Sequence, residues 1–169
     1  MDRMKWFGRN TEAAILYAIV FLSPLLVGHP QDAVGIIVNG ALVFAALRLP
    51  VKRAVPVIVI PVLGVLARAL VFGPFPPFLP VTILLALAGN AILVSLIIAV
   101  KRKWLNLAAG IITKSAFMFL CTTALVSLSI LPAAVLAVMG LFQFYTAAVG
   151  GAAVMLVLEF LGRKSGQKK

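Results

Sequence analysis

Residues 79–127 decide the fold; they read LPVTILLALAGNAILVSLIIAV-KRK-WLNLAAGIITKSAFMFLCTTALVS. Three consecutive basic residues, Lys101 to Lys103, separate two long apolar runs in this stretch. Over the whole chain, apolar residues make up 63% and charged residues only 11%. A water-soluble globule of 169 residues needs a more polar exterior than this composition provides. We therefore expect an all-α polytopic membrane protein whose apolar helices are surrounded by lipid.

A helix needs about 20 residues to cross the roughly 30 Å hydrocarbon core of a bilayer, and this length divides the chain into six spans. The spans are expected at residues 11–27, 33–49, 55–72, 79–100, 105–127 and 132–161, all in a single transmembrane domain. They are continuously apolar rather than alternating, which favours helices over membrane strands. Residues 73–80 contain four prolines, each of which fixes its own φ, so we expect this connection to be non-helical.

The basic residues predict how the spans are oriented, because Lys and Arg near span ends are retained on the cytoplasmic side. Thirteen of the 15 basic residues fall in the N-terminus, the second connection, the fourth connection and the C-terminal tail. The other three connections, residues 28–32, 73–78 and 128–131, contain no Lys or Arg. Six spans with both termini in the cytoplasm place all four basic segments on one side.

The formal net charge of +11 does not indicate nucleic-acid binding, because topology and attraction to anionic lipid headgroups account for it. We expect the lipid bilayer, and no nucleic acid, as a partner. The chain has one cysteine, one histidine and no CxxC or HExxH motif, so we predict neither a metal site nor a cofactor. It also lacks a nucleophile–base pair and a Gly-rich phosphate loop. We therefore expect no enzyme activity, and any ATP-driven step would belong to a partner.

Polar side chains at membrane depth are costly, and they usually face the protein interior or a water-filled cavity. Lys114 lies ten residues into its span, which places it about 15 Å deep at a rise of about 1.5 Å per residue. Asn90 lies at a similar distance from the outer end of its span, and Arg68 lies one turn below the outer end of the third span. Gln143 and Tyr145 lie in the outer half of the sixth span. These five residues are the candidate substrate-binding residues.

The sequence has four acidic residues, Asp2, Glu12, Asp32 and Glu159. Three lie near the cytoplasmic side and Asp32 lies in an outer connection, so none is expected at the depth of Lys114. An unpaired buried ammonium either loses its proton or finds an anion. In one interpretation, Lys114 and Arg68 receive an anionic ligand from outside. In the other, Asn90 or backbone carbonyls hold Lys114, and Arg68 extends to the outer surface.

Five short segments resemble a known family. They are Leu79-Pro80, Gly89 to Val94, Lys114 to Leu120, Gln143 to Ala147 and Gly150-Gly151. In these segments the chain is similar to substrate-binding S components of energy-coupling factor (ECF) transporters. The resemblance implies an S-component-like bundle of six spans with both termini inside, in the cytoplasmic membrane of a prokaryote.

The resemblance also implies a function. Such a subunit binds a small vitamin-like or micronutrient substrate on its outer side. It then associates with a membrane T component and two ATPase subunits, which power release inward as in an ABC importer. Small residues four positions apart on the first helix serve T-component docking in the family, and Ala14 and Ala18 match that role.

A different class of function also fits a chain of this composition. A structural or assembly protein of the cell envelope would be equally apolar and polytopic, with no small-molecule ligand. It would need an extensive protein-facing surface but no ligand cavity, so saturable binding of a small molecule to the detergent-purified protein distinguishes the two interpretations.

Overall fold

The computed structural model describes residues 2–27, 31–73, 75–99 and 103–166, and within these ranges the chain is mostly helical and has no strand. The elements are α1 (Asp2–Leu22), the π-helical turn η1 (Ser23–Val27), α2 (Gln31–Arg48), α3 (Val51–Phe72), α4 (Leu79–Ala99), α5 (Lys103–Ser127), α6 (Ala134–Met139) and α7 (Leu141–Gly166). The predicted all-α class is confirmed.

Six helical segments are long and apolar enough to cross a membrane. They are Asn10–Val27, Gln31–Arg48, Val51–Phe72, Leu79–Ala99, Trp104–Ser127 and Ala134–Gly162. Each begins and ends within four residues of a predicted span. The prediction of six helices long and apolar enough to cross a membrane is therefore confirmed, and these helices suggest a multi-pass membrane protein.

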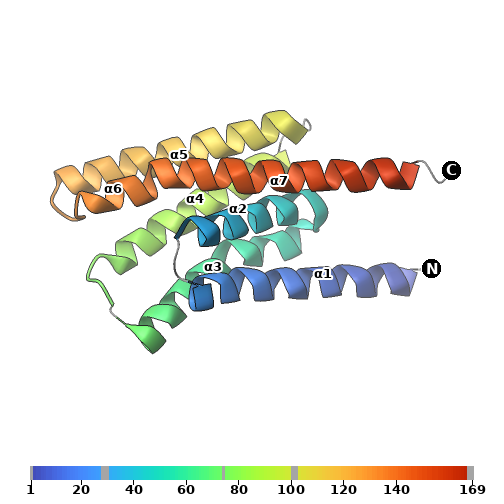
Figure 1. The fold of residues 1–169 in the computed structure, drawn as a ribbon, viewed down its shortest axis with the longest axis horizontal. Coiled ribbons are helices and arrows are strands. Elements are labelled where there is room, and N and C mark those ends of the chain that lie inside the picture. The colour runs from blue at the N-terminus through green and yellow to red at the C-terminus, as the bar shows by residue number, and fades with distance from the viewer. Residues whose placement is uncertain (1, 28–30, 74, 100–102, 167–169) are drawn as a thin grey trace.

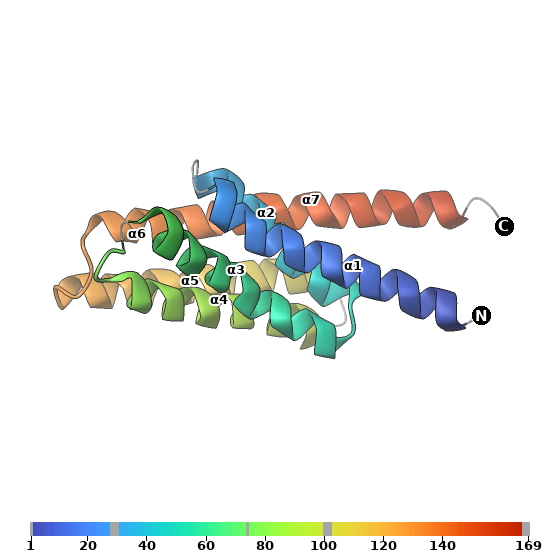
Figure 2. The ribbon, with the colours of Figure 1, turned by 90° about the horizontal axis from the view of Figure 1, so that it is seen from below.

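Consecutive spans run antiparallel, so the start of α1 and the end of α7 lie at the same end of the bundle (Figures 1 and 2). The connection between α2 and α3 and the start of α5 lie toward this end as well (Figure 1). We call it the terminal end, and the opposite end the loop end. The arrangement agrees with the predicted grouping of the basic segments, while the side of a membrane that the terminal end faces stays a prediction.

Helices α2 and α7 approach each other closely because both carry glycine at the contact. A Cβ atom on Gly150 would overlap the carbonyl oxygen of Ile36 and would lie 2.8 Å from the backbone nitrogen of Gly40. A Cβ atom on Gly40 would lie 3.2 Å from the carbonyl oxygen of Gly150. Such small-residue contacts are a usual way for membrane helices to pack, since lipid supplies no hydrophobic drive between them.

The structure departs from the predicted elements at two places. The span expected at 132–161 is not one helix: it breaks at Gly140, whose φ of −103° and ψ of −92° are not helical, so α6 and α7 are separate. The non-helical connection expected at 73–80 ends earlier, because α4 already begins at Leu79 and includes Pro80. Proline is tolerated in the first turn of a helix, where its missing N–H would have no helical partner.

Candidate functional site

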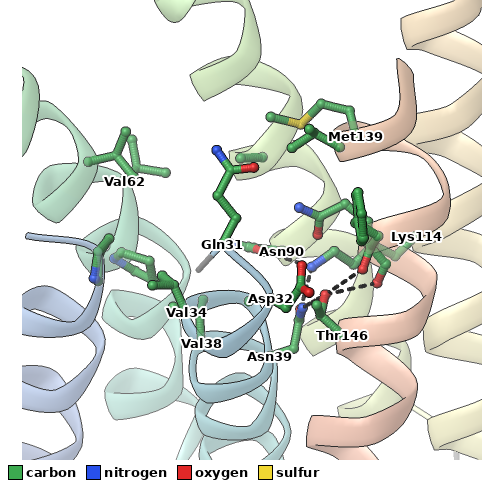
Figure 3. Close-up of a pocket in the computed structure, with 18 of the residues that line it drawn as sticks. Gln31, Asp32, Val34, Val38, Asn39, Val62, Asn90, Lys114, Met139 and Thr146 are labelled. Carbon is green, nitrogen blue, oxygen red and sulfur yellow. Dashed lines mark hydrogen bonds between the residues drawn. The ribbon is translucent and has the colours of Figure 1, made fainter. Parts of the chain in front are cut away.

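A partly open cavity of about 310 Å³ lies between the helices toward the loop end (Figure 3). Its walls come from η1, α2, α3, α4, α5, α6 and α7. The polar residues on these walls are Gln31, Asp32, Asn39, Arg68, Asn90, Lys114, Gln143 and Thr146. Most of the others are apolar side chains such as Val34, Val38, Val62 and Met139. A few polar groups on a largely apolar concave surface are typical of small-molecule sites.

Lys114 is the centre of the polar network in this cavity. Its side chain is 1% exposed, and it projects from the middle of α5 toward α2 and α4. The ammonium donates hydrogen bonds to Asn39 Oδ1 at 2.6 Å and to Asn90 Oδ1 at 3.0 Å. An ammonium has three N–H donors, so these two bonds leave one for a group in the cavity.

The two asparagine amides are held with their oxygens toward Lys114. Asn39 Nδ2 donates to Thr146 Oγ1 at 3.0 Å, and that hydroxyl donates to the Phe142 carbonyl at 2.8 Å. Asn90 Nδ2 lies 3.4 Å from the Ile58 carbonyl, to which it donates. Because each amide nitrogen has its own acceptor, each amide oxygen remains available to a cation. The network therefore presents two neutral acceptors to one ammonium.

The charges around Lys114 are not balanced locally. Within the described ranges, no carboxylate lies within ion-pair distance of its ammonium. Asp32, expected in an outer connection, instead belongs to the first turn of α2 and lines the same cavity. It precedes Asn39 by seven residues, which is about 10 Å along the helix. The position of Asp32 agrees with the expectation that no acid lies at the depth of Lys114. The prediction that Asp32 belongs to an outer connection was wrong, because Asp32 lies in helix α2.

Arg68 lines the cavity near the loop end of α3. Its Nη1 donates to the Leu25 carbonyl at 2.9 Å, and its guanidinium carbon lies 5.6 Å from the centre of the Phe72 ring. Both contacts position the guanidinium within the protein. Arg68 therefore lines the cavity and is held by protein groups, while ligand binding by Arg68 and its extension to the outer surface both stay predictions.

Four of the five candidate residues, Lys114, Asn90, Arg68 and Gln143, meet at this cavity. The fifth does not: Tyr145 is absent from the cavity wall and is 50% exposed. It follows Gln143 by two residues, and such residues point to opposite sides of a helix. Substrate binding by the four residues stays a prediction.

Two members of the network were missed from the sequence. Asn39 lies in the apolar run VGIIVNGALV, where a buried amide at membrane depth is itself a signal for function. Thr146 gave no such signal, because a threonine hydroxyl in a helix can bond to the carbonyl four residues earlier, as it does here to Phe142.

The two residues predicted to dock a T component lie elsewhere. Ala14 and Ala18 are both exposed on α1, away from the cavity wall. In the part of the chain that the structure describes, no three His, Cys, Asp or Glu side chains gather as a metal site would require. No protein-family model, curated protein or solved structure matches the chain.

Proposed function

We propose that this chain is the substrate-binding membrane subunit of an importer and that it takes a small anionic molecule into the cavity from the loop end. The observation that carries the proposal is Lys114, a buried ammonium on a cavity wall with two neutral acceptors and no described carboxylate beside it. Removing an ammonium from water is costly unless a charged partner compensates. An anionic group of a ligand would supply that partner.

The cavity limits the size of the ligand. Its volume of about 310 Å³ is at the lower end of the roughly 300–1,000 Å³ usual for ligand sites. A molecule of the size of a small vitamin or micronutrient fits this volume. A purely structural protein of the cell envelope has no need of such a cavity, so the cavity favours a ligand-binding role.

The position of the cavity supports the resemblance to ECF S components. Asn90, Lys114, Gln143 and Thr146 belong to the short segments that carry the resemblance, and all four line the cavity. We infer that a membrane T component and two ATPase subunits complete the importer in a prokaryotic cytoplasmic membrane. The exposed pair Ala14 and Ala18 on α1 is the proposed docking surface for the T component, since small residues allow close helix approach.

The test is to identify what the protein binds. The wild-type chain is purified in mild detergent, and small molecules released from it are identified by mass spectrometry. The same is done with Lys114→Met and with Lys52→Met, a matched change at an exposed lysine on α3. We expect one anionic molecule to accompany the wild type and Lys52→Met but not Lys114→Met. A cationic molecule, or equal retention by all three proteins, would contradict the proposal.

The proposal also requires that the loop end faces outward. A reporter fused after Lys169 should then be active in the cytoplasm. Activity on the outer face alone would place the cavity mouth on the cytoplasmic side, and uptake from outside would be excluded.

A further inference from the structure

Asp32 is an acidic side chain on the cavity wall that has no protein partner among the described residues. It is half-buried in the first turn of α2, and it lines the same cavity as Lys114 (Figure 3). Across the described ranges, no hydrogen bond or ion pair joins its carboxylate to another residue. A carboxylate in the first turn of a helix interacts favourably with the helix dipole. The helix dipole would stabilise the carboxylate on any side of α2, so it does not explain why Asp32 lines the cavity.

One face of α2 connects Asp32 with the Lys114 network. Residues 32, 35 and 39 are spaced by three and four positions, so they lie on the same side of the helix. The residue between the two polar ones is Gly35, which also lines the cavity. A Cβ atom there would lie 2.8 Å from Thr146 Cγ2, so glycine at this position lets the Thr146 side chain of α7 pack directly against α2. Between Asp32 and Asn39, Gly35 and Thr146 thus form a continuous part of the cavity wall.

Arg68, the described cation that lines the cavity near the loop end, has other partners. Arg68 is bound to the Leu25 carbonyl and stacked on Phe72, and no ion pair joins it to Asp32 among the described residues. The cavity thus has the Lys114 ammonium at its inner end and both Asp32 and Arg68 nearer the loop end. Asp32 precedes Asn39, the partner of Lys114, by about 10 Å along α2. A ligand with one charged end would leave Asp32 without a partner in a partly desolvated position.

We infer that the ligand is zwitterionic, with its anionic group at Lys114 and an amine at Asp32. This inference rests on the proposed function, because it concerns the ligand of the same cavity. Asn39, which accepts from the Lys114 ammonium, lies about 10 Å from Asp32 along α2, so the two charges of the ligand would be separated by up to about 10 Å. The amine would remain toward the loop end, through which the ligand enters.

A series of simple amino acids of increasing length tests the inference, whatever the natural ligand is. The probes are glycine, 3-aminopropanoate, 4-aminobutanoate, 5-aminopentanoate and 6-aminohexanoate, with pentanoate and pentylamine as singly charged controls. Their affinities are measured from the shift of the thermal unfolding midpoint of the detergent-purified protein. The proteins are the wild type, Asp32→Asn, Lys114→Met and Glu12→Gln, the last a matched change at an exposed acid on α1.

We expect the wild type to bind the longer amino acids about tenfold or more tightly than pentanoate, because a second charged hydrogen bond is formed. Asp32→Asn should lose this advantage and bind amino acid and pentanoate alike. Lys114→Met should bind neither, and Glu12→Gln should behave as the wild type does.

Three results would overturn the inference. They are equal wild-type affinity for pentanoate and the best amino acid, an advantage that survives Asp32→Asn, and failure of the whole series to bind. In the first two cases, Lys114-dependent binding of pentanoate would still support the proposed function. In the third, the co-purification experiment decides the proposed function separately.

Discussion

The terminal end and the loop end of the bundle are built from the same helices but differ in what they bury. At the terminal end, the buried cluster is apolar and includes Leu42, Val57, Leu93, Leu107 and Met155. Toward the loop end, the same helices surround a cavity with a buried ammonium, two amides and a carboxylate. The terminal end is stabilised by this filled interior. The loop end has a smaller apolar cluster, Leu85, Met118, Leu131 and Val135, but it also keeps an open volume and meets its polar costs by hydrogen bonds.

This difference indicates a division of roles within one bundle. The close contact of α2 with α7 at Gly40 and Gly150 lies between the two ends, directly beside the Asn39–Thr146 hydrogen bond. Packing at that contact therefore sets the distance across which the polar network forms. Mutations at the two ends should separate ligand affinity from stability, and mutations at the contact should affect both.

The largest effect is expected from Lys114. Lys114→Met leaves the ligand's anionic group desolvated and unpaired, which should cost about 2–5 kcal/mol, or roughly 30- to several-thousand-fold in affinity. Lys114→Arg should also weaken binding, because a planar fork does not replace a compact ammonium between two amide oxygens. Titration calorimetry with the co-purifying molecule measures both.

The fold of the Lys114 variants is checked by their unfolding midpoints. Substitution frees the oxygens of Asn39 and Asn90, so some loss of stability is expected. A variant that unfolds near the wild-type midpoint and still binds with wild-type affinity would return Lys114 to a purely structural role.

The spans and the burial of Lys114 could be predicted from sequence because both depend on composition along one helix. Span length and hydropathy follow from the bilayer thickness, and a lysine ten residues into an apolar run is costly wherever its neighbours lie. The break at Gly140 was not predictable in this way. Glycine is common inside membrane helices, so its presence alone does not mark a helix end.

The partners across the bundle were the harder part of the site. Asn39 is 75 positions from Lys114 in sequence, and Thr146 is 107 positions from Asn39. Their contacts depend on how α2, α5 and α7 are rotated about their axes, and small-residue packing sets this rotation. The same rotation turns Tyr145 away from the cavity and brings Asp32 onto its wall.

A smaller effect is expected from the two amides. Asn39→Ala removes the shorter bond to the ammonium, and hydrogen bonds to charged groups contribute about 1.5–3 kcal/mol. Asn90→Ala removes a bond of 3.0 Å and should cost about 1–3 kcal/mol of ligand affinity. Calorimetric titration of the co-purifying molecule into each variant gives the two losses. If both variants bound the molecule as tightly as the wild type does, the ammonium would not need these oxygens to hold a ligand.

The stability of the α2–α7 contact at Gly40 and Gly150 should be sensitive to the addition of a single methyl group. Gly150→Ala places a Cβ atom against the backbone of Ile36 and Gly40, so α2 and α7 must separate, at a cost of about 1–3 kcal/mol of stability. Gly151→Ala is the matched control, because the atom nearest to its Cβ is at the flexible end of the Leu107 side chain. Thermal unfolding in detergent should show a lower midpoint for Gly150→Ala than for Gly151→Ala. Similar midpoints would mean that the helices separate without cost.

The smallest expected effect on ligand affinity comes from a comparison of Gln143 and Tyr145, which lie two positions apart on α7. Gln143 lines the cavity, so Gln143→Ala should remove at most one neutral hydrogen bond to the ligand, about 0.5–1.5 kcal/mol or roughly 2- to 10-fold in affinity. Tyr145 is 50% exposed and faces away, so Tyr145→Ala should leave affinity unchanged. Affinities measured on the two variants side by side test the rotation of α7 itself. If Tyr145→Ala were the more damaging change, this helix would present a different face to the ligand than the one that carries Gln143 and Thr146.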